Sequence, residues 1–192
     1  MFPSNFLSPI PRQGLPSHSF TYLSPFQAPS PLSISIPIPP LRNKDKHASF
    51  VWNASIVLAD MIANEKIKVE RKTVLEPGCG VGLPSIVAAH KGAQQVVLSD
   101  YDDPRMLDDL KEVVHKALIS THRNELSVVG HSFGEPISSL LGQVSPCPYD
   151  IILVADCIWD RALHVPLLDT LTTLLEASSP STAVHFERGG EE

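Results

Sequence analysis

The sequence predicts an α/β fold built on a mostly parallel sheet. Apolar segments of strand length alternate with segments of helical periodicity along residues 41–192. The strand-like segments are apolar at their centres, which is typical of parallel strands covered on both faces. This alternation favours helices on both sides of the sheet, joined by right-handed crossovers. The expected strands are Thr73–Glu76, Gln95–Ser99, Leu126–Gly130, Tyr149–Ala155 and Thr182–Phe186.

Helices are expected before and between these strands. In each of them, apolar residues recur at spacings of three and four, which places them on one face of a helix. Gly92 is expected to end the second helix, because glycine tolerates the left-handed conformation found there. The expected helices are Trp52–Ala63, Pro84–His90, Pro104–Ile119 and Arg161–Ala177.

Residues 1–40 differ in composition from the rest of the chain. They hold 10 of the 18 prolines and eight serines, they contain no acid, and Arg12 is their only fully charged residue. Proline removes backbone donors and blocks helices and central strands, so this segment is predicted to be disordered or polyproline-like. We therefore divide the chain into a Pro/Ser-rich tail, residues 1–40, and one α/β domain, residues 41–192.

Composition argues against several classes of function. The net charge is −6 and no basic stripe is present, so no nucleic-acid partner is expected. Cys79, Cys147 and Cys157 show no ligand-like spacing, so neither a metal site nor a disulfide framework is expected. No apolar run approaches the ~20 residues of a membrane span. A cytoplasmic or nuclear protein with reduced thiols fits these observations best.

A glycine-rich turn follows the first expected strand directly. Its sequence is Glu76-Pro-Gly78-Cys79-Gly80-Val-Gly82. Alternate glycines let the chain turn sharply and bring backbone N–H groups against a ligand. The dinucleotide fingerprint GxGxxG does not fit, because its third glycine would fall on Leu83. A pyrophosphate cradle is therefore disfavoured.

An acid ends the second expected strand. Asp100 lies 24 positions after Glu76. In nucleotide-binding α/β sheets, an acid at this place accepts hydrogen bonds from ribose hydroxyls. The alternative is a surface acid that caps the next helix, and Asp102 and Asp103 are better placed for that. Asp100 is thus a predicted ribose ligand.

The turn pattern E-x-G-x-G-x-G resembles the first motif of class I methyltransferases, which bind S-adenosylmethionine. Four further segments occur in the order expected for one family: VWNASIVLADMI, GLPS, GHSFG and ILVADCIWDRALHVPLL. Together they are similar to the seven-β-strand methyltransferases grouped with protein lysine methyltransferases (family 16), over roughly residues 47–186. The resemblance is greatest to a fungal branch first named nicotinamide N-methyltransferase-like. That branch was later linked to N-terminal and lysine methylation of translation elongation factor 1-alpha.

The resemblance implies a Rossmann-like, three-layer α/β/α domain with a defined cofactor site. Trp52 would close over the methionine side of the ligand, and Glu76 would suit its cationic sulfonium. Phe133 stands where the family has a tryptophan that packs on adenine, and it offers a smaller π-face without an N–H. Alternatively, both aromatics belong to the core and Cys79 is a packing residue. The implied cofactor-binding residues are Trp52, Glu76, Gly78, Cys79, Gly80, Asp100, Phe133 and Ala155.

Two residues after the fourth expected strand are candidates for the chemistry. Asp156 stands at the carboxyl end of that strand, where α/β sheets place ligands. There a carboxylate can hold an ammonium group, and Trp159 can form an aromatic wall that favours a cation. Alternatively, Asp156 caps the following helix. Trp159 replaces the Tyr or Phe that the family usually has, so the size or identity of the acceptor is expected to differ.

The resemblance implies an S-adenosylmethionine-dependent N-methyltransferase that acts on a lysine or N-terminal amine of a protein, such as a translation factor. The sequence stops just after the fifth strand, so we expect the last strands of the family sheet to be missing. Two alternatives stay open. One is a catalytically impaired binding or scaffold protein, and the other is a small-molecule, nicotinamide-type N-methyltransferase.

Overall fold

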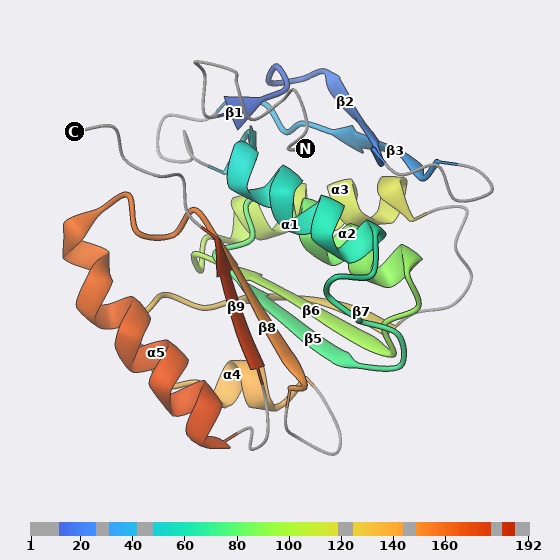
Figure 1. The fold of residues 1–192 in the computed structure, drawn as a ribbon. Helices are drawn as coiled ribbons and strands as arrows, with labels where there is room; N and C mark the ends of the chain where they lie inside the picture. The colour runs from blue at the N-terminus through green and yellow to red at the C-terminus, as the bar shows by residue number, and fades with distance from the viewer. Residues whose placement is uncertain are drawn as a thin grey trace, which may run out of the picture.

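Five parallel strands form the central sheet of the computed structural model (Figure 1). Their order across the sheet is β7-β6-β5-β8-β9. The bounds of each strand agree with the expected ones to within two residues. The strands are β5 (Thr73–Pro77), β6 (Gln95–Asp100), β7 (Glu125–Gly130), β8 (Ile151–Ala155) and β9 (Thr182–Phe186). The structure describes residues 12–25, 31–41, 48–118, 125–143, 149–177 and 182–186.

Both faces of the sheet are buried, as the apolar strands predicted. Along β5, Val74 belongs to one apolar cluster and Leu75 to the other, because successive side chains point to opposite faces. The same alternation separates Ile151 from Ile152 in β8. Helices cover both faces, which confirms the predicted Rossmann-like, three-layer arrangement (Figure 1).

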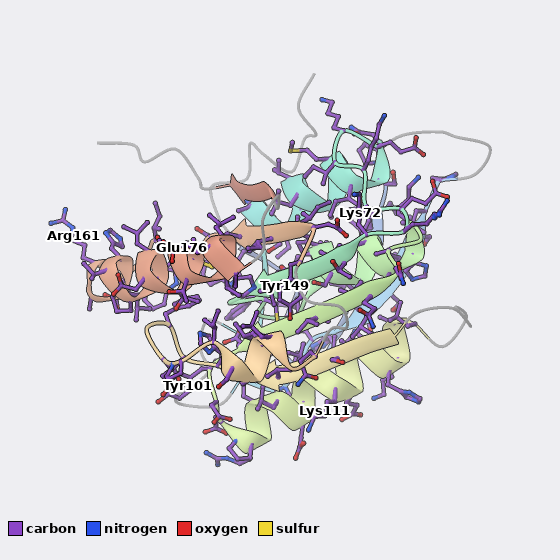
Figure 2. The ribbon with its side chains drawn as sticks, turned by 90° about the horizontal axis from the view of Figure 1, so that it is seen from below. Lys72, Tyr101, Lys111, Tyr149, Arg161 and Glu176 are labelled. Atoms are coloured by element: carbon purple, nitrogen blue, oxygen red, sulfur yellow. The ribbon has the colours of Figure 1, made fainter. Side chains whose placement is uncertain are left out.

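The first cluster lies beneath α1 (Asn53–Ala63), α2 (Leu83–His90) and α3 (Pro104–Ala117). The second lies beneath α4 (Ser138–Leu141) and α5 (His164–Ala177). On the solvent side of these layers, Lys111 and Arg161 project outward, whereas Tyr149 lies inside the molecule (Figure 2). No helix among the described residues is long and apolar enough to cross a membrane.

Local sequence explains where two helices begin. Asp103 caps α3 by accepting hydrogen bonds from the N–H groups of Arg105 and Met106, and Pro104 supplies the pre-set backbone of the first helical position. Helix α1 begins at Asn53, one residue later than predicted. The reason is that Trp52 has an extended backbone and belongs to the two-residue strand β4 (Val51–Trp52). A 3-10 turn, η2 (Arg161–Leu163), precedes α5.

The N-terminal segment is ordered where the structure describes it, so the predicted disorder of residues 1–40 is wrong for residues 12–25 and 31–40. Strands β2 (Ser19–Leu23) and β3 (Ser33–Pro37) form an antiparallel hairpin. Strand β1 (Arg12–Gln13) pairs with β4. Alternating serine and isoleucine give β3 one apolar face, and that face is buried in the core beside α3. Residues 1–11 and 26–30 lie outside the described residues.

A buried hydrogen bond fastens this hairpin to α1. The hydroxyl of Tyr22 in β2 donates to Asp60 Oδ1 at 2.8 Å, and both side chains are buried. Burial raises the pKa of Asp60 to about 6. Burial and the neighbouring carboxyl group also raise the pKa of Tyr22, so this hydroxyl keeps its proton and remains a donor. The hairpin is therefore an integral layer of the described structure.

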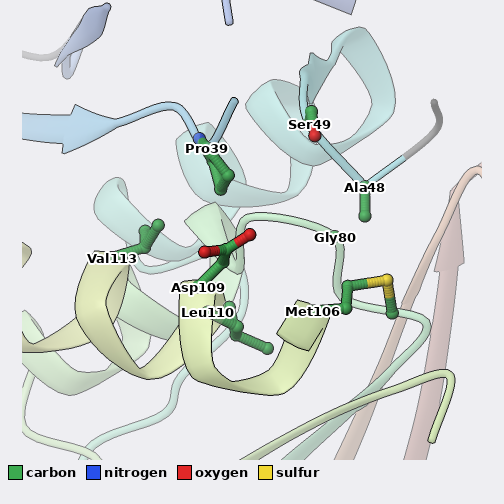
Figure 3. A pocket seen from close by; sticks show the side chains of 8 residues that line it. All are labelled: Pro39, Ala48, Ser49, Gly80, Met106, Asp109, Leu110 and Val113. Carbon is green, nitrogen blue, oxygen red and sulfur yellow. The ribbon is translucent and has the colours of Figure 1, made fainter. Parts of the chain in front are cut away.

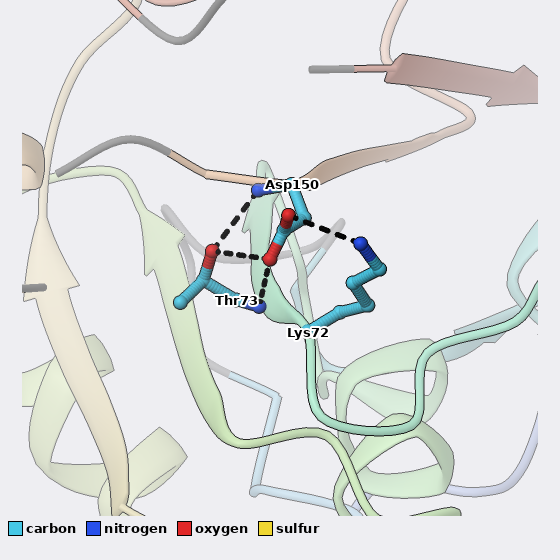
Figure 4. A network of polar contacts seen from close by, with 3 residues as sticks. All are labelled: Lys72, Thr73 and Asp150. Carbon is cyan, nitrogen blue, oxygen red and sulfur yellow. Dashed lines mark hydrogen bonds and ion pairs between the residues drawn. The ribbon is translucent and has the colours of Figure 1, made fainter. Parts of the chain in front are cut away.

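A polar network joins β5 to β8 at the amino end of the sheet (Figure 4). The N–H and hydroxyl of Thr73 donate to Asp150 Oδ2 at 2.8 and 3.0 Å. Lys72 Nζ lies 3.3 Å from Asp150 Oδ1. Partial burial opposes ionisation of Asp150, but these hydrogen bonds outweigh it and lower its pKa. The network holds two neighbouring strands in register at the end opposite the glycine-rich turn.

Candidate functional site

A cavity of about 330 Å³ lies at the carboxyl ends of four strands. Gly78 follows β5, Asp100 ends β6, His131 follows β7 and Ala155 ends β8, and all four residues line it. Because neighbouring strands are ~4.8 Å apart, the cavity extends over roughly 14 Å from β7 to β8. Its lining consists of Ala48, Trp52, Ser55, Gly78, Cys79, Gly80, Asp100, Tyr101, Asp103, Met106, His131, Ser132, Phe133, Ala155, Asp156, Cys157, Trp159 and Leu163.

The glycine-rich turn forms the floor of this cavity. Gly78 and Gly80 have φ values of 67° and 57°, in the left-handed region that favours glycine. A Cβ atom at Gly78 would lie 2.9 Å from Cys157 Sγ and 3.0 Å from Phe133 Cζ. Glycine is therefore required at position 78 for its backbone conformation and for space. All three residues from Gly78 to Gly80 line the cavity, but the N–H groups of Cys79 and Gly80 are bonded within the protein, to the carbonyl oxygen of Ser99 and to Asp100. Contact of the turn with a ligand stays a prediction.

Asp100 holds the turn and faces the cavity. Its Oδ2 accepts a hydrogen bond from the N–H of Gly80 at 2.7 Å, and its Oδ1 accepts one from the N–H of Tyr101 at 2.7 Å. A carboxylate has acceptor capacity beyond these two bonds. The alternative role, capping α3, belongs to Asp103. Asp100 thus stands where a ligand's hydroxyl groups can reach it.

Glu76 is the one predicted site residue that the structure places outside the cavity lining. Its side chain is only 1% exposed, and its Oε2 accepts hydrogen bonds from the N–H and hydroxyl of Ser85 at 2.9 and 2.5 Å. Burial raises the pKa of Glu76 to about 8. The structure therefore corrects the prediction that Glu76 lies beside a cationic ligand. Its carboxyl group instead links the end of β5 to Ser85 at the start of α2.

Besides His131, four aromatic side chains line the cavity, from Trp52, Tyr101, Phe133 and Trp159. Trp52 is half-buried and packs edge-to-face against Phe50, with ring centroids 6.5 Å apart. Phe133 lines the cavity and also packs against the core cluster beneath α5. Its contact with a ligand stays a prediction. Trp159 is 54% exposed and stands at the rim.

The turn after β8 brings Asp156 to the cavity. Asp156 has a φ of 56°, a left-handed conformation that is uncommon for residues other than glycine. The next helical turn is capped by Asp160, whose side chain accepts from the N–H of Ala162 at 2.9 Å. Asp156 therefore does not fill the capping role considered as its alternative. Strained backbone of this kind is concentrated at functional sites.

The sequence motifs did not single out His131 as a site residue, although it lies within the GHSFG segment. His131 lines the cavity and is 3% exposed, and neither ring nitrogen has a hydrogen-bond partner among the described residues. The available signal was its position directly after the third strand of a parallel sheet. Both buried thiols, Cys79 and Cys157, also line the cavity. Burial raises the pKa of Cys79 well above its usual value, so a packing role suits it better than a nucleophilic one.

The carboxyl groups that line the cavity have no basic counterpart among the described lining residues. Asp100, Asp103 and Asp156 contribute carboxyl groups, and no lysine or arginine is among the described residues that line the cavity. This favours a cationic ligand over a phosphate-bearing one. No cluster of three or more potential metal ligands occurs in the described part of the chain.

A smaller hollow lies next to Gly80, with α3 on one side and Pro39, Ala48 and Ser49 on the other (Figure 3). Its volume is about 10 Å³. That is room for about one water molecule at most, so this hollow is not a ligand site.

Comparison with known proteins identifies the family. The sequence model described as lysine methyltransferase matches residues 41–191. The chain belongs to this family. The family inferred from the sequence motifs is thereby confirmed.

Curated relatives from fungi agree with this assignment. A protein N-terminal and lysine N-methyltransferase of Schizosaccharomyces pombe is 33% identical over 141 residues, which cover 72% of this chain and 54% of the relative. The corresponding protein of Aspergillus fumigatus is 31% identical over 142 residues, 72% of this chain and 55% of the relative. The chain thus spans about half the length of these relatives. Among solved structures, an RNA methyltransferase from Salinibacter ruber in complex with S-adenosyl-L-homocysteine matches with 18% identity and a TM-score of 0.46, over 67% of this chain and 72% of that one.

Proposed function

We propose that this lysine methyltransferase family member uses S-adenosylmethionine to methylate a lysine or N-terminal amine of a protein. The observation that carries the proposal is the cavity at the carboxyl ends of four parallel strands. It is elongated, partly aromatic and lined by three carboxyl groups without a described lysine or arginine. The names of the fungal relatives, protein N-terminal and lysine N-methyltransferases, support a protein acceptor.

The residues present fit this cofactor better than a dinucleotide. S-Adenosylmethionine carries a positive sulfonium and no phosphate, which suits a site with carboxyl groups and no described cationic side chain. Asp100 would accept the ribose hydroxyls, and Phe133 would pack on the base. The turn formed by Gly78, Cys79 and Gly80 would contact the ligand through its backbone.

Two further residues would hold the amino-acid half of the cofactor. Trp52 lies on β4, and Ala155 ends β8, where both line the cavity. Trp52 would cover the methionine side. Because β1 pairs with β4, the N-terminal segment supports the strand that carries this tryptophan.

The chain's own residues would orient the acceptor amine. When bound, the cofactor supplies a methyl group on a positively charged sulfur, open to in-line displacement by a neutral amine. Asp156 would hold the amine by accepting its hydrogen bonds, and Trp159 would form an aromatic wall at the rim that favours a cation. The amine must lose a proton before it attacks, so the contribution of these residues is positioning and exclusion of water.

We further infer an acceptor in the translation apparatus and hence a cytoplasmic location, because the sequence motifs resemble the branch linked to translation elongation factor 1-alpha. The test is an assay with radiolabelled S-adenosylmethionine and that factor, with an Asp156→Asn variant of the chain as the control. We expect label on a lysine or the N-terminus of the factor, and less of it with the variant. Label that appears only on a small amine such as nicotinamide would overturn the protein acceptor.

The cofactor assignment is tested by calorimetric titration of the full chain with S-adenosylhomocysteine. We expect micromolar binding that is about 10- to 100-fold weaker in Asp100→Ala, the loss that follows from a charged hydrogen bond. Asp108→Ala is the matched control, because this exposed acid on α3 lies outside the cavity lining and pairs with Lys111 at the surface. It should bind like the wild type. No binding by a folded wild-type chain would overturn the proposal.

A further inference from the structure

His131 is a buried polar group that none of the described residues satisfies. The side chain is 3% exposed, and both of its ring nitrogens lack a hydrogen-bond partner among the described residues. Buried polar groups without partners are rare, because losing water without gaining a hydrogen bond costs about 1–3 kcal/mol. His131 lines the cavity, so a bound molecule can supply the missing partners.

The imidazole of His131 is held in its neutral form. Burial lowers the pKa of His131, and the nearby Glu135 opposes this shift only partly. A neutral imidazole carries one N–H donor and one nitrogen acceptor. It therefore suits an uncharged ligand group better than a carboxylate or a phosphate, because a neutral ring offers no positive charge to an anion.

The sheet topology places His131 at one end of the cavity. Its backbone N–H donates to the carbonyl oxygen of Asp100 at 2.9 Å, so His131, which follows β7, is a neighbour of the residue that ends β6. Asp156, the candidate for holding the acceptor amine, follows β8, three strands away from β7 in the order of the sheet. A nucleoside whose ribose meets Asp100 and whose cationic end points toward β8 must therefore place its base on the β7 side.

We propose that His131 recognises the base of the bound nucleoside by forming a hydrogen bond to the adenine edge. This inference rests on the proposed function and deepens it. The two ring nitrogens of an imidazole point away from each other, so one of them bonds the adenine edge, either donating to a ring nitrogen or accepting from the amino group. His131 thereby contributes polar recognition at the base, where Phe133 lines the same cavity with an apolar ring.

The test compares two ligands and two variants of the full chain. Calorimetry measures binding of S-adenosylhomocysteine and of adenosine to the wild type, His131→Phe and His131→Asn. Phenylalanine keeps the ring and removes both nitrogens, whereas asparagine keeps one donor group and one acceptor. His115→Asn is the matched control, because this histidine is exposed on α3.

We expect His131→Phe to weaken both ligands by the same factor, about 3- to 10-fold, as for the loss of a neutral hydrogen bond. His131→Asn should restore part of this loss. The ligand-free His131→Phe chain should melt at the same or a higher temperature than the wild type, because it no longer buries an unpaired polar group. A purely structural role for His131 would instead lower the melting temperature of the free chain.

The outcomes separate the inference from the proposed function. A wild-type chain that does not bind S-adenosylhomocysteine overturns both. If the wild type and His131→Phe bind S-adenosylhomocysteine equally well, only the role of His131 is overturned. If His131→Phe binds S-adenosylhomocysteine more weakly but adenosine equally well, the contact lies at the homocysteine half and the inference is also overturned. If His131→Phe does not fold, nitrogen NMR of the wild-type imidazoles decides. Adenosine must shift the ring nitrogens of His131, and unchanged signals would overturn the inference.

Discussion

The two ends of the central sheet differ in how fully their polar side chains are hydrogen-bonded. At the amino end, Asp150 receives hydrogen bonds from Thr73 and Lys72, and the hydroxyl of Tyr149 donates to the carbonyl oxygen of Leu140 at 2.6 Å. At the carboxyl end, Glu76 Oε1 and both ring nitrogens of His131 are buried without a partner among the described residues.

This difference indicates where the fold is optimised for stability and where it is prepared for a ligand. Pairing every buried polar group stabilises a structure, and leaving some unpaired is tolerated where another molecule completes the bonds. Both ends are built on the same strands, so the contrast does not come from local propensity. Variants at the two ends should therefore affect stability and ligand binding differently.

The largest effect is expected from Gly78→Ala at the carboxyl end. A methyl group there meets Cys157 Sγ and Phe133 Cζ, and the left-handed backbone adds strain. The combined cost is roughly 2–5 kcal/mol. Thermal unfolding should show the destabilisation, and calorimetry should show that S-adenosylhomocysteine binding is lost.

Gly92→Ala is the matched control from the amino end. Gly92 has a φ of 85°, but the nearest atom to an added Cβ would be Glu70 Cγ at 3.6 Å. Only the backbone strain remains, about 1–2 kcal/mol. Equal losses of affinity in the two glycine variants would contradict the contrast between the ends.

An intermediate effect that depends on pH is expected from Glu76→Gln. The pKa of Glu76 is raised from 4.5 to about 8 in the folded chain, so the folded state keeps a proton that the unfolded state releases between these values. Wild-type stability from this group is therefore greatest below pH 4.5 and falls as the pH rises toward 8. Glutamine removes this dependence and should make the variant more stable by on the order of 3 kcal/mol at pH 8.

The measurement is urea unfolding of both chains between pH 5 and 8, where the difference should widen with pH. A constant difference would show that Glu76 is already ionised when folded. Ser85→Ala provides a comparison, because it removes the hydroxyl that donates to the carboxyl group at 2.5 Å.

The smallest effect is expected from Asp150→Ala at the amino end. The variant loses its hydrogen bonds to Thr73 and should be about 1–2 kcal/mol less stable at neutral pH. Because the folded pKa of Asp150 is lowered, this contribution is present above the unfolded value of 3.8 and is lost as the pH falls through the folded pKa. S-Adenosylhomocysteine affinity at neutral pH should stay unchanged in calorimetry, and a loss of affinity would mean that the two ends are coupled.

The strands and the glycine-rich turn after β5 could be predicted because their causes are local. Buried parallel strands are continuously apolar, and the alternate glycines permit the left-handed turn that the structure shows. The N-terminal hairpin was missed because prolines are usually read as breakers. Pro37 stands at the end of β3, which pairs only with β2, where a missing backbone donor is tolerated.

Side-chain direction explains the two differences within the site. Glu76 and Asp100 are both acids at the ends of neighbouring strands, yet Asp100 lines the cavity and Glu76 turns toward Ser85. No spacing rule distinguishes them. His131 is a lone histidine, and its significance lies in the absence of described partners, which only a folded neighbourhood can show.

By itself, the sequence determined the α/β class, the family, the strand order along the chain and the positions of Gly78, Asp100 and Asp156 at strand ends. These depend on periodicity and on residues close together in the chain. The tertiary structure decided that the hairpin packs on α1 and α3, that Glu76 is buried behind the turn, and that His131 faces the cavity unpaired. These depend on contacts between distant segments, whose energies arise only when the sheet and its helices are packed together.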